Sequence, residues 1–450
     1  MITNFLSLPT QASLMRTTVL KNLSLLLFCF SLFISPLQAQ EKLKGLIDGG
    51  EVRGKPIAIV PFKVTDGSVI EHQIHEIVAF DLNASGKFES IPTKDFLSQP
   101  SRDEEVRYKD WRFINAEILV IGEVLTLGPD SYELQFRMYN VVRQEQIGSG
   151  KRISGLTMRN LRTAAHVISD NVYQAFTGRQ GAFQSRMAYV ERKEVEYQRF
   201  RYQLMVSDWD GYGAVEVAAS WKPILSPSWS PDATELAFVS YASRGPIIKT
   251  VNFNSGQEKV IADFKGVNSA PAWSPDGTKI AYSTSRHGSP DIYVYDVLTK
   301  QHRRISTHYG IDTEPSWSPR GESFLFTSSR SGKPQIYSYS MSDGTVSRMT
   351  FEGDESANAS YDLDGRQIVM VHEGGQIVVM NEETSQITPL TLAKFDESPS
   401  FSPNGDMVLY KTEQQYEPAL MVASSDGRVR TRLELVRGDV REPAWSPLRQ

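Results

Sequence analysis

Two histidines stand close enough in the sequence to share a metal ion. His72 and His75 are three residues apart on the polar side of a segment with helical periodicity. A zinc site needs three or four protein ligands, and no third ligand stands nearby. We therefore interpret both as surface histidines, and His166 as a partly buried, hydrogen-bonded side chain of a later helix. Acidic loops could hold calcium, but the chain has no twelve-residue calcium loop.

Catalytic motifs are absent from the sequence. The Gly-x-Ser-x-Gly elbow of serine hydrolases does not occur, and neither does a Walker phosphate loop or a Gly-x-Gly-x-x-Gly dinucleotide motif. We therefore predict a protein that is not an enzyme and needs no cofactor.

The remaining polar residues with regular spacing precede a repeated aromatic residue. This aromatic recurs at intervals of 44, 44, 44, 40 and 44 residues, as Trp229, Trp273, Trp317, Tyr361, Phe401 and Trp445. The residues three positions earlier are Ser226, Ala270, Glu314, Asn358, Ser398 and Glu442. With Glu397, the acids among them could form a surface for basic groups of a partner. Alternatively, they are solvated loop acids.

The repeat itself predicts a β-propeller of six blades. Each copy combines the aromatic with a turn such as Pro275-Asp276-Gly277 and with about three further short apolar strands. Units of this length built from strands are typical of propeller blades. We expect the aromatics to fill the gaps between blades rather than to bind a ligand.

The two ends of the repeat region predict how the ring closes. The last copy stops a few residues after Trp445 and so lacks most of its strands. Residues 186–190 and 202–208, before the first copy, resemble the corresponding strands 279–283 and 291–296 of a complete copy. We expect the sixth blade to combine both ends, which would hide edge strands that promote aggregation.

The region before the propeller has a different pattern. A buried strand is expected at 55–62, a helix at 69–82, strands at 117–125, 132–141 and 146–153, and a helix from Leu161 to Phe176 that ends at Gly178. The fold class is therefore an α/β N-terminal domain followed by an all-β propeller. We place the α/β domain at residues 40–180 and the propeller at 181–450.

Residues 1–39 have the features of a secretory signal peptide. Arg16 and Lys21 precede the apolar run LSLLLFCFSLFI, and a small-residue cleavage position follows at Ala39. A membrane anchor is the alternative, but twelve apolar residues are too few to cross a bilayer. The true start could be Met1 or Met15. Without this segment, the mature chain has no transmembrane segment and no cysteine, since Cys29 is the only one.

The charge balance argues against nucleic acid as a partner. The full chain has 48 Lys and Arg against 53 Asp and Glu, a formal charge of −5. Removal of the signal leaves 46 bases and 53 acids, or −7. A mildly acidic chain without a dense basic patch is a poor general binder of nucleic acid.

Several stretches resemble the TolB family, the periplasmic propeller proteins of the Tol–Pal system. They are GKPIAIVPF at 54–62, DLN at 81–83 with SGKF at 85–88, the segment 161–170, TG at 177–178 with GAF at 181–183, VSDWDGY at 206–212 and TEP at 313–315. The resemblance covers essentially the whole mature chain. It implies a periplasmic, monomeric binding protein that supports outer-membrane integrity and constriction during division.

The resemblance also implies partners and contact residues. The lipoprotein Pal would bind at the propeller mouth, where Val267, Ala270 and Thr313 align with family contact positions and Val267 replaces a histidine often found there. Glu314, Glu397 and Glu442 complete the predicted Pal site. Contacts with other outer-membrane proteins could follow from the same system. An alternative to Pal is another protein ligand or a small molecule.

TolA would take up the N-terminal segment EKLKGLIDGG, residues 41–50, by strand addition. The predicted contact residues are Leu43, Lys44, Leu46, Ile47 and Asp48. Gly45 stands where the family usually has a larger apolar residue, which could weaken the strand. A disordered tail is the alternative.

Overall fold

The computed structural model describes residues 54–392, 395–414, 417–434, 436 and 438–448. The predicted signal peptide and the predicted TolA-binding residues Leu43, Lys44, Leu46, Ile47 and Asp48 lie outside these ranges.

The first described region contains a mixed seven-stranded sheet. Its main order is β3-β1-β4-β5-β6, with β2 beside β4 and β7 beside β5. β1 is parallel to β3 and β4, whereas β4 and β5 form a long antiparallel pair. The strands are β1 (Lys55–Ile59), β2 (Lys63–Val64), β3 (Phe88–Ser90), β4 (Ile118–Gly128), β5 (Ser131–Asn140), β6 (Glu145–Gln146) and β7 (Lys151–Leu156).

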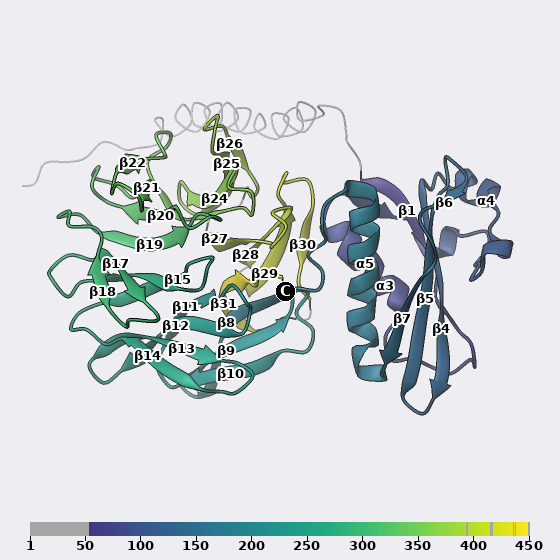
Figure 1. Ribbon diagram of the computed structural model, residues 1–450, viewed down its shortest axis with the longest axis horizontal. Helices are drawn as coiled ribbons and strands as arrows, with labels where there is room; N and C mark the ends of the chain where they lie inside the picture. The colour runs from purple at the N-terminus through teal and green to yellow at the C-terminus, as the bar shows by residue number, and fades with distance from the viewer. Residues whose placement is uncertain (1–53, 393–394, 415–416, 435, 437, 449–450) are drawn as a thin grey trace, which may run out of the picture. The chain divides into compact units, whose positions relative to one another are not determined.

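Two helices, α3 (Ile74–Ala84) and α5 (Leu161–Thr177), cover one face of this sheet (Figure 1). The other face packs against the segment with η1 (Thr93–Asp95), η2 (Asp103–Glu105) and α4 (Tyr108–Phe113), whose Trp111 is fully buried. A last short turn, η3 (Met158–Asn160), leads into α5. The expected α/β domain is therefore present as a three-layer unit.

Most of the elements expected here are confirmed, with two differences. The first helix starts at Ile74 instead of 69, because Gln73 is extended and Ile70 reaches the core from a preceding loop. The strand expected at 146–153 is split into β6 and β7, since Gly148 takes a positive φ of 66° between them. By contrast, α5 ends as predicted, with Gly178 in the left-handed conformation at φ 75°.

Six four-stranded antiparallel sheets follow and form the propeller (Figure 1). From the inner to the outer strand, the first five blades are β11 (Ile224–Trp229), β12 (Glu235–Ala242), β13 (Gly245–Asn252) and β14 (Glu258–Ala262); β15 (Asn268–Trp273), β16 (Lys279–Thr284), β17 (Asp291–Asp296) and β18 (His302–Arg304); β19 (Asp312–Trp317), β20 (Ser323–Ser328), β21 (Gln335–Ser340) and β22 (Val346–Arg348); β23 (Ser356–Tyr361), β24 (Gln367–His372), β25 (Gln376–Asn381) and β26 (Ile387–Pro389); and β27 (Glu397–Phe401), β28 (Met407–Gln414), β29 (Glu417–Ser424) and β30 (Arg430–Arg432).

The sixth blade combines the two ends of the repeat region, as predicted. Its strand order is β10-β9-β8-β31, where β8 (Arg186–Glu196), β9 (Arg199–Asp208) and β10 (Val215–Ser220) precede the first repeat and β31 (Asp439–Trp445) ends the last. β31 pairs with β8 from Asp439 opposite Arg192 to Trp445 opposite Met187. Hydrogen bonds between strands therefore close the ring.

The repeated aromatics pack between blades, as expected. Trp229 and Trp317 are at most 9% exposed. Their indole N–H groups donate to backbone oxygens of the preceding blade, Ala444 and Ala272, both at 3.1 Å. Each indole thus joins two blades by apolar contact and by a hydrogen bond.

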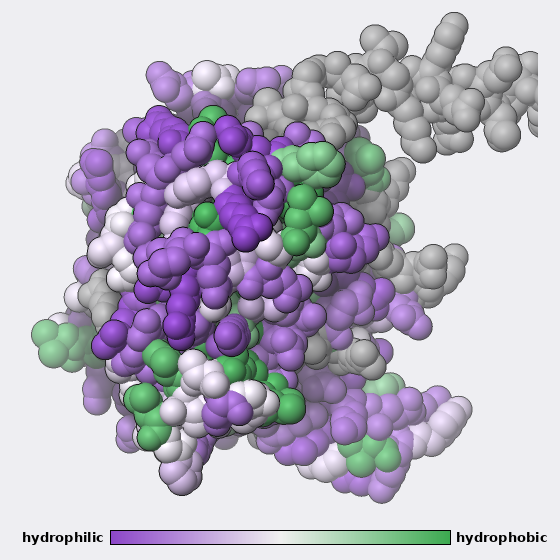
Figure 2. Space-filling model, turned by 90° about the vertical axis from the view of Figure 1, so that its right-hand side faces the viewer, coloured by the Kyte–Doolittle hydropathy of each residue, from purple (hydrophilic) through white to green (hydrophobic). Residues whose placement is uncertain are grey.

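The described chain is compact from residue 54 onward, and contacts join the α/β sheet region to the propeller. The Tyr173 hydroxyl on α5 donates to Asp406 at 2.7 Å, and Arg162 forms an ion pair with Asp210. Among the described helices, none is long and apolar enough to cross a membrane. The face shown in Figure 2 is largely hydrophilic, with hydrophobic side chains in small separate groups.

Candidate functional site

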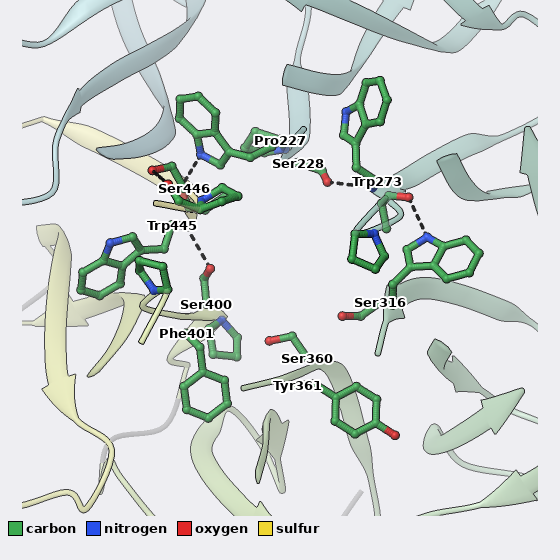
Figure 3. Close-up of a pocket in the computed structure, with 18 of the residues that line it drawn as sticks. Pro227, Ser228, Trp273, Ser316, Ser360, Tyr361, Ser400, Phe401, Trp445 and Ser446 are labelled. Carbon is green, nitrogen blue, oxygen red and sulfur yellow. Dashed lines mark hydrogen bonds between the residues drawn. The ribbon is translucent and has the colours of Figure 1, made fainter. Parts of the chain in front are cut away.

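The six inner strands surround a cavity of about 840 Å³ along the propeller axis. One repeated stretch from each blade lines it, centred on the sequence Ser-Pro-Ser-Trp or its variants. In Figure 3 the hydroxyls of Ser316 and Ser360 point into this space, whereas the rings of Tyr361 and Phe401 point away from it. Small polar groups therefore face the channel and the aromatic rings support it from behind.

The mouth of the channel is marked by a ring of six residues with the same unusual backbone. Their φ angles all lie between 48° and 54°, in the left-handed region, and they are Ser226, Ala270, Glu314, Asn358, Ser398 and Glu442. Apart from Asn358, none is a residue type that favours this region, so each of the other five conformations costs about 1–2 kcal/mol. A shift of pairing register accompanies each one, as in a β-bulge. Bulges of this kind redirect side chains, which here places the six side chains around the opening.

Two acids of this ring join neighbouring blades. The Glu314 carboxylate accepts hydrogen bonds from the Asn358 N–H at 2.9 Å and the Thr327 hydroxyl at 2.7 Å. Glu442 accepts the Ser226 N–H in the same way, and burial raises the pKa of its carboxyl. One oxygen of each carboxylate therefore stabilises the ring, while both side chains still line the channel.

The other predicted contact residues lie near the ring but do not line the channel. Val267 is 45% exposed in the loop before β15, and its N–H donates to Ser285 at 2.8 Å. Thr313 is half-buried, on β19 beside Glu314. Glu397 starts β27 and pairs with Lys411 at 2.8 Å. The structure thus brings Ala270, Glu314 and Glu442 together and places these three further out.

Lys411 is a residue that sequence reasoning missed. Its side chain is 7% exposed and contacts Glu397 and Glu413, both at 2.8 Å. Burial alone would lower its pKa, but the hydrogen bonds to the two carboxylates raise it. Its position on β28 matches no motif, so the only signal was a lysine inside an apolar strand.

A second polar cluster lies between α3, α5 and the turn after β9. His166 Nδ1 is 2.8 Å from Asp81 Oδ2, and the Ser169 hydroxyl donates to the same oxygen at 2.6 Å. Burial opposes a charge on His166, yet the carboxylates of Asp81 and Asp210 raise its pKa to about 9. Burial also raises the pKa of Asp81. This cluster is fully buried, so His166 is more enclosed than its sequence context suggested.

Neither region forms a metal centre. Within the described ranges, no group of three or more His, Cys, Asp or Glu side chains could hold a metal ion. The Nε2 atom of His72 instead lies 3.2 Å from the Tyr212 hydroxyl oxygen. The chemistry available at the mouth is therefore hydrogen bonding, charge and apolar contact.

Comparisons with known proteins give the same architecture and a family. The model of the TolB amino-terminal domain matches residues 46–147, and the model of the TolB beta propeller domain matches residues 173–449. "Tol-Pal system protein TolB" of Xanthomonas oryzae pv. oryzae is 45% identical over 436 residues, which cover 94% of this chain and 98% of the relative. The protein of the same name from Nitrosococcus oceani is 48% identical over 404 residues, or 89% of this chain and 92% of its own.

A solved structure extends this likeness to three dimensions. The crystal structure of TolB from Acinetobacter baumannii has a TM-score of 0.79 and 36% identity, and the match covers 88% of this chain and 97% of that one. The family models thus match the two regions seen in the structure, and the relatives and the solved structure match most of the chain. The chain belongs to the TolB family of Tol–Pal system proteins.

Proposed function

We propose that this protein is a periplasmic binding component of the Tol–Pal system that receives Pal at the propeller mouth and TolA at its N-terminal segment. In this role it supports outer-membrane integrity and constriction of the envelope during division. It acts by binding rather than by catalysis. Residues 1–39 would serve as the export signal, and the mature chain would start near residue 40.

The observation that carries the proposal is the ring at the mouth. Six blades present six side chains from one shared backbone conformation, but the side chains themselves differ: two serines, two glutamates, one alanine and one asparagine. Hydrogen bonds between blades account for Glu314 and Glu442 but not for the differences among the other four side chains. Strained backbone that presents varied, partly exposed side chains supports a recognition surface.

The geometry of the ring supports the predicted Pal contacts. Ala270 leaves a gap in the ring, because it carries only a methyl group between Ser226 and Glu314. Val267 and Thr313 stand beside this gap, and Glu397 stands on the outer side of the ring. A partner side chain that enters the channel at Ala270 would contact the first, second and third blades, which carry Ser226, Ala270 and Glu314.

Titration calorimetry of residues 40–450 with the soluble domain of Pal tests the proposal. We expect saturable one-to-one binding that Ala270→Glu strongly weakens, because the new carboxylate would fill the gap. Thr313→Ala should weaken it as well. The control is Glu383→Lys, at an exposed hairpin between β25 and β26, which should bind normally. A folded protein without detectable Pal binding would contradict the proposal.

TolA binding is tested separately on the N-terminal segment. Deletion of residues 40–48 should abolish TolA binding and leave Pal binding intact. The reason is that Leu43, Leu46 and Ile47 would supply the apolar side of an added strand. Undiminished TolA binding by the truncated chain would overturn this part.

A further inference from the structure

We call the loops that lead into the inner strands, together with the hairpins between the second and third strands, the belt around the mouth. Hydrogen bonds connect each loop to a neighbouring hairpin: the Ser329 N–H donates to Ile311 at 2.9 Å, Glu373 N–H to Glu355 at 3.2 Å, and Asp396 N–H to Gly375 at 2.8 Å. Lys411 continues the belt by joining Glu397 and Glu413. Side chains on these loops therefore share one surface, outside the ring of six.

Part of this belt, across the third to fifth blades, is rich in acids. We call it the acidic rim, and its exposed members are Glu352, Asp354, Glu355, Glu373, Glu397, Glu413 and Glu417. Nearby bases compensate only part of this charge. Lys333 pairs with Asp354 at 2.6 Å, Arg432 with Glu417 at 4.0 Å, and Lys411 is buried between Glu397 and Glu413. The Arg348 guanidinium lies 5.2 Å from the centre of the Phe351 ring. Glu352 and Glu355 form no ion pair with any other described residue.

Large apolar side chains are interleaved with these acids. Tyr309 is 84% exposed, Phe351 71%, and Leu392 and Phe395 79% and 71%. They belong to the three consecutive loops that lead into β19, β23 and β27. Aromatic anchors surrounded by charge are typical of protein interfaces, whereas a solvated face would not expose four such side chains in adjacent loops.

The opposite part of the belt differs in sign. Around the first and second blades the exposed charged residues include the bases Arg244, Lys265 and Arg286 and one acid, Asp263, so bases outnumber acids among them. Arg286 stacks over Phe264, 4.1 Å from the ring centre. The mouth is therefore bipolar, and a charged partner can satisfy both sides in one orientation only.

From the acidic rim and its apolar anchors, we propose that the mouth partner docks with a basic face whose centre is apolar. Lysine or arginine side chains of the partner lie over Glu352, Glu355 and Glu373, while its apolar side chains cover Phe351 and Phe395. This inference rests on the proposed function, because the Pal protein would carry that face. It adds that affinity depends on residues well outside the channel.

Charge reversal tests the electrostatic half. The double variant Glu352→Lys/Glu355→Lys should lower the affinity for soluble Pal at least about tenfold, mainly through slower association, because it repels a basic face. The loss should shrink at high salt, since ions screen charges at exposed sites. The matched control is Glu382→Lys/Glu383→Lys, which makes the same charge change at the other end of the fourth blade, and it should bind as the unchanged protein does.

The apolar half has its own variant. Phe351→Ala/Phe395→Ala should speed dissociation about tenfold and leave the salt dependence as it was, because it removes contact area and no charge. Melting curves of all variants confirm that the propeller is folded. Since the replaced side chains are exposed, we expect these curves to change little.

The outcomes separate this inference from the proposed function. If Pal binds the unchanged protein, Ala270→Glu weakens it, and the rim variants bind normally, the inference is overturned and the proposed function stands. If Pal does not bind the folded, unchanged protein, both are overturned. Weaker binding by both rim variants, with a normal control, supports the inference.

Discussion

The six inner strands have two ends: the ring of six residues lies near their N-terminal ends, at the mouth, and a turn follows their C-terminal ends, which we call the floor. Both ends contain left-handed backbone, but with different residue types. At the floor, the turn after each inner strand has glycine in four blades, Gly277, Gly321, Gly365 and Gly405, with φ between 69° and 76°. At the mouth, the six ring residues have φ between 48° and 54° and none is glycine. One end of the blade therefore adopts this conformation at low cost, and the other does not.

Packing explains the glycines at the floor. A Cβ atom on Gly277 would lie 3.3 Å from the Pro231 ring of the preceding blade, and one on Gly321 would lie 3.4 Å from Pro275. Three of the four turns thus rest against the proline of the preceding blade, and the turn at Gly405 rests against Asp362. At the mouth, Glu314 and Glu442 join neighbouring blades by hydrogen bonds, and non-glycine residues adopt the strained conformation and present their side chains. The comparison teaches that uniform residues mark the structural end, while varied residues on a uniform backbone mark the end proposed for recognition.

The largest effect should come from opening the ring of blades, which removes the inner strand of the sixth blade together with the ring residue Glu442. Deletion of residues 440–450 takes away most of β31 and with it Trp445, which stacks on Trp209 at 5.9 Å. We expect a sharply lower melting temperature, with a loss above the roughly 3–5 kcal/mol typical of removing one buried tryptophan. Trp445→Phe, which keeps an aromatic ring, should lose much less. An unchanged melting curve for the deletion would contradict the closure by β31.

The buried pair of Asp81 and His166, beside the turn after β9 in the sixth blade, comes next. Asp81→Ala leaves His166 charged and without its partner in a fully buried place, which should cost about 3–5 kcal/mol of unfolding free energy. Glu76→Ala, on the exposed side of the same helix, is the control and should stay within about 0.5 kcal/mol. Chemical denaturation measures both. Equal losses would mean that the pair does not hold α3 and α5 against the propeller.

The same pair predicts how stability varies with pH. The folded pKa of His166, about 9, lies above its ordinary value near 6.5, so the protonated form is favoured in the folded state. Protonated His166 contributes roughly 1–3 kcal/mol to the free energy of unfolding. This contribution is complete below pH 6.5 and is lost as the pH rises through 9. Unfolding free energies of the unchanged protein should fall over this range, and His166→Gln should flatten the curve. Parallel curves for the two proteins would argue against a charged His166.

A glycine at the floor should show a smaller, purely local effect. Gly321→Ala places a side chain at φ 71° against Pro275, which should cost about 1–2 kcal/mol. The chain tolerates this arrangement once, because Ala233 holds the equivalent place in the first blade at φ 54°. Gly128→Ala is the control, since a Cβ there meets nothing within 4 Å. A neutral Gly321→Ala would show that the floor needs glycine no more than the mouth does.

The sequence was sufficient for the features set by local pattern. The spacing of the aromatics and turns predicted six blades. The truncated last copy and the matching segments before the first copy predicted the composite sixth blade, because the pattern of one repeat can be recognised in each piece even though the two pieces are far apart in the chain. Gly178 marked the end of α5 for the same reason.

Features that depend on tertiary contacts could not be predicted in this way. Ser226, Ala270 and Glu314 are not residues that favour positive φ, so nothing local indicated the strained ring. The hydrogen bond from Asn358 to Glu314 joins residues 44 apart, and the pair of Asp81 and His166 joins residues 85 apart. These pairings follow from how the blades and helices pack, and a reading of spacing alone misses them.

Substitutions at the mouth should have the smallest effect on the free energy of unfolding. This expectation tests the comparison of mouth and floor most directly. Ala270→Glu should change the unfolding free energy by no more than about 0.5 kcal/mol, because glutamate already occupies the equivalent left-handed position at Glu314 and Glu442. Ala270→Val should cost about 1–2 kcal/mol more, since a β-branched side chain fits this conformation poorly. Chemical denaturation of both variants measures stability, and the Pal titration of Ala270→Glu measures binding, so the two effects can be separated. If Ala270→Glu destabilises as much as Ala270→Val, the side chains of the ring are fixed by packing like those at the floor, and their variety is no evidence for recognition.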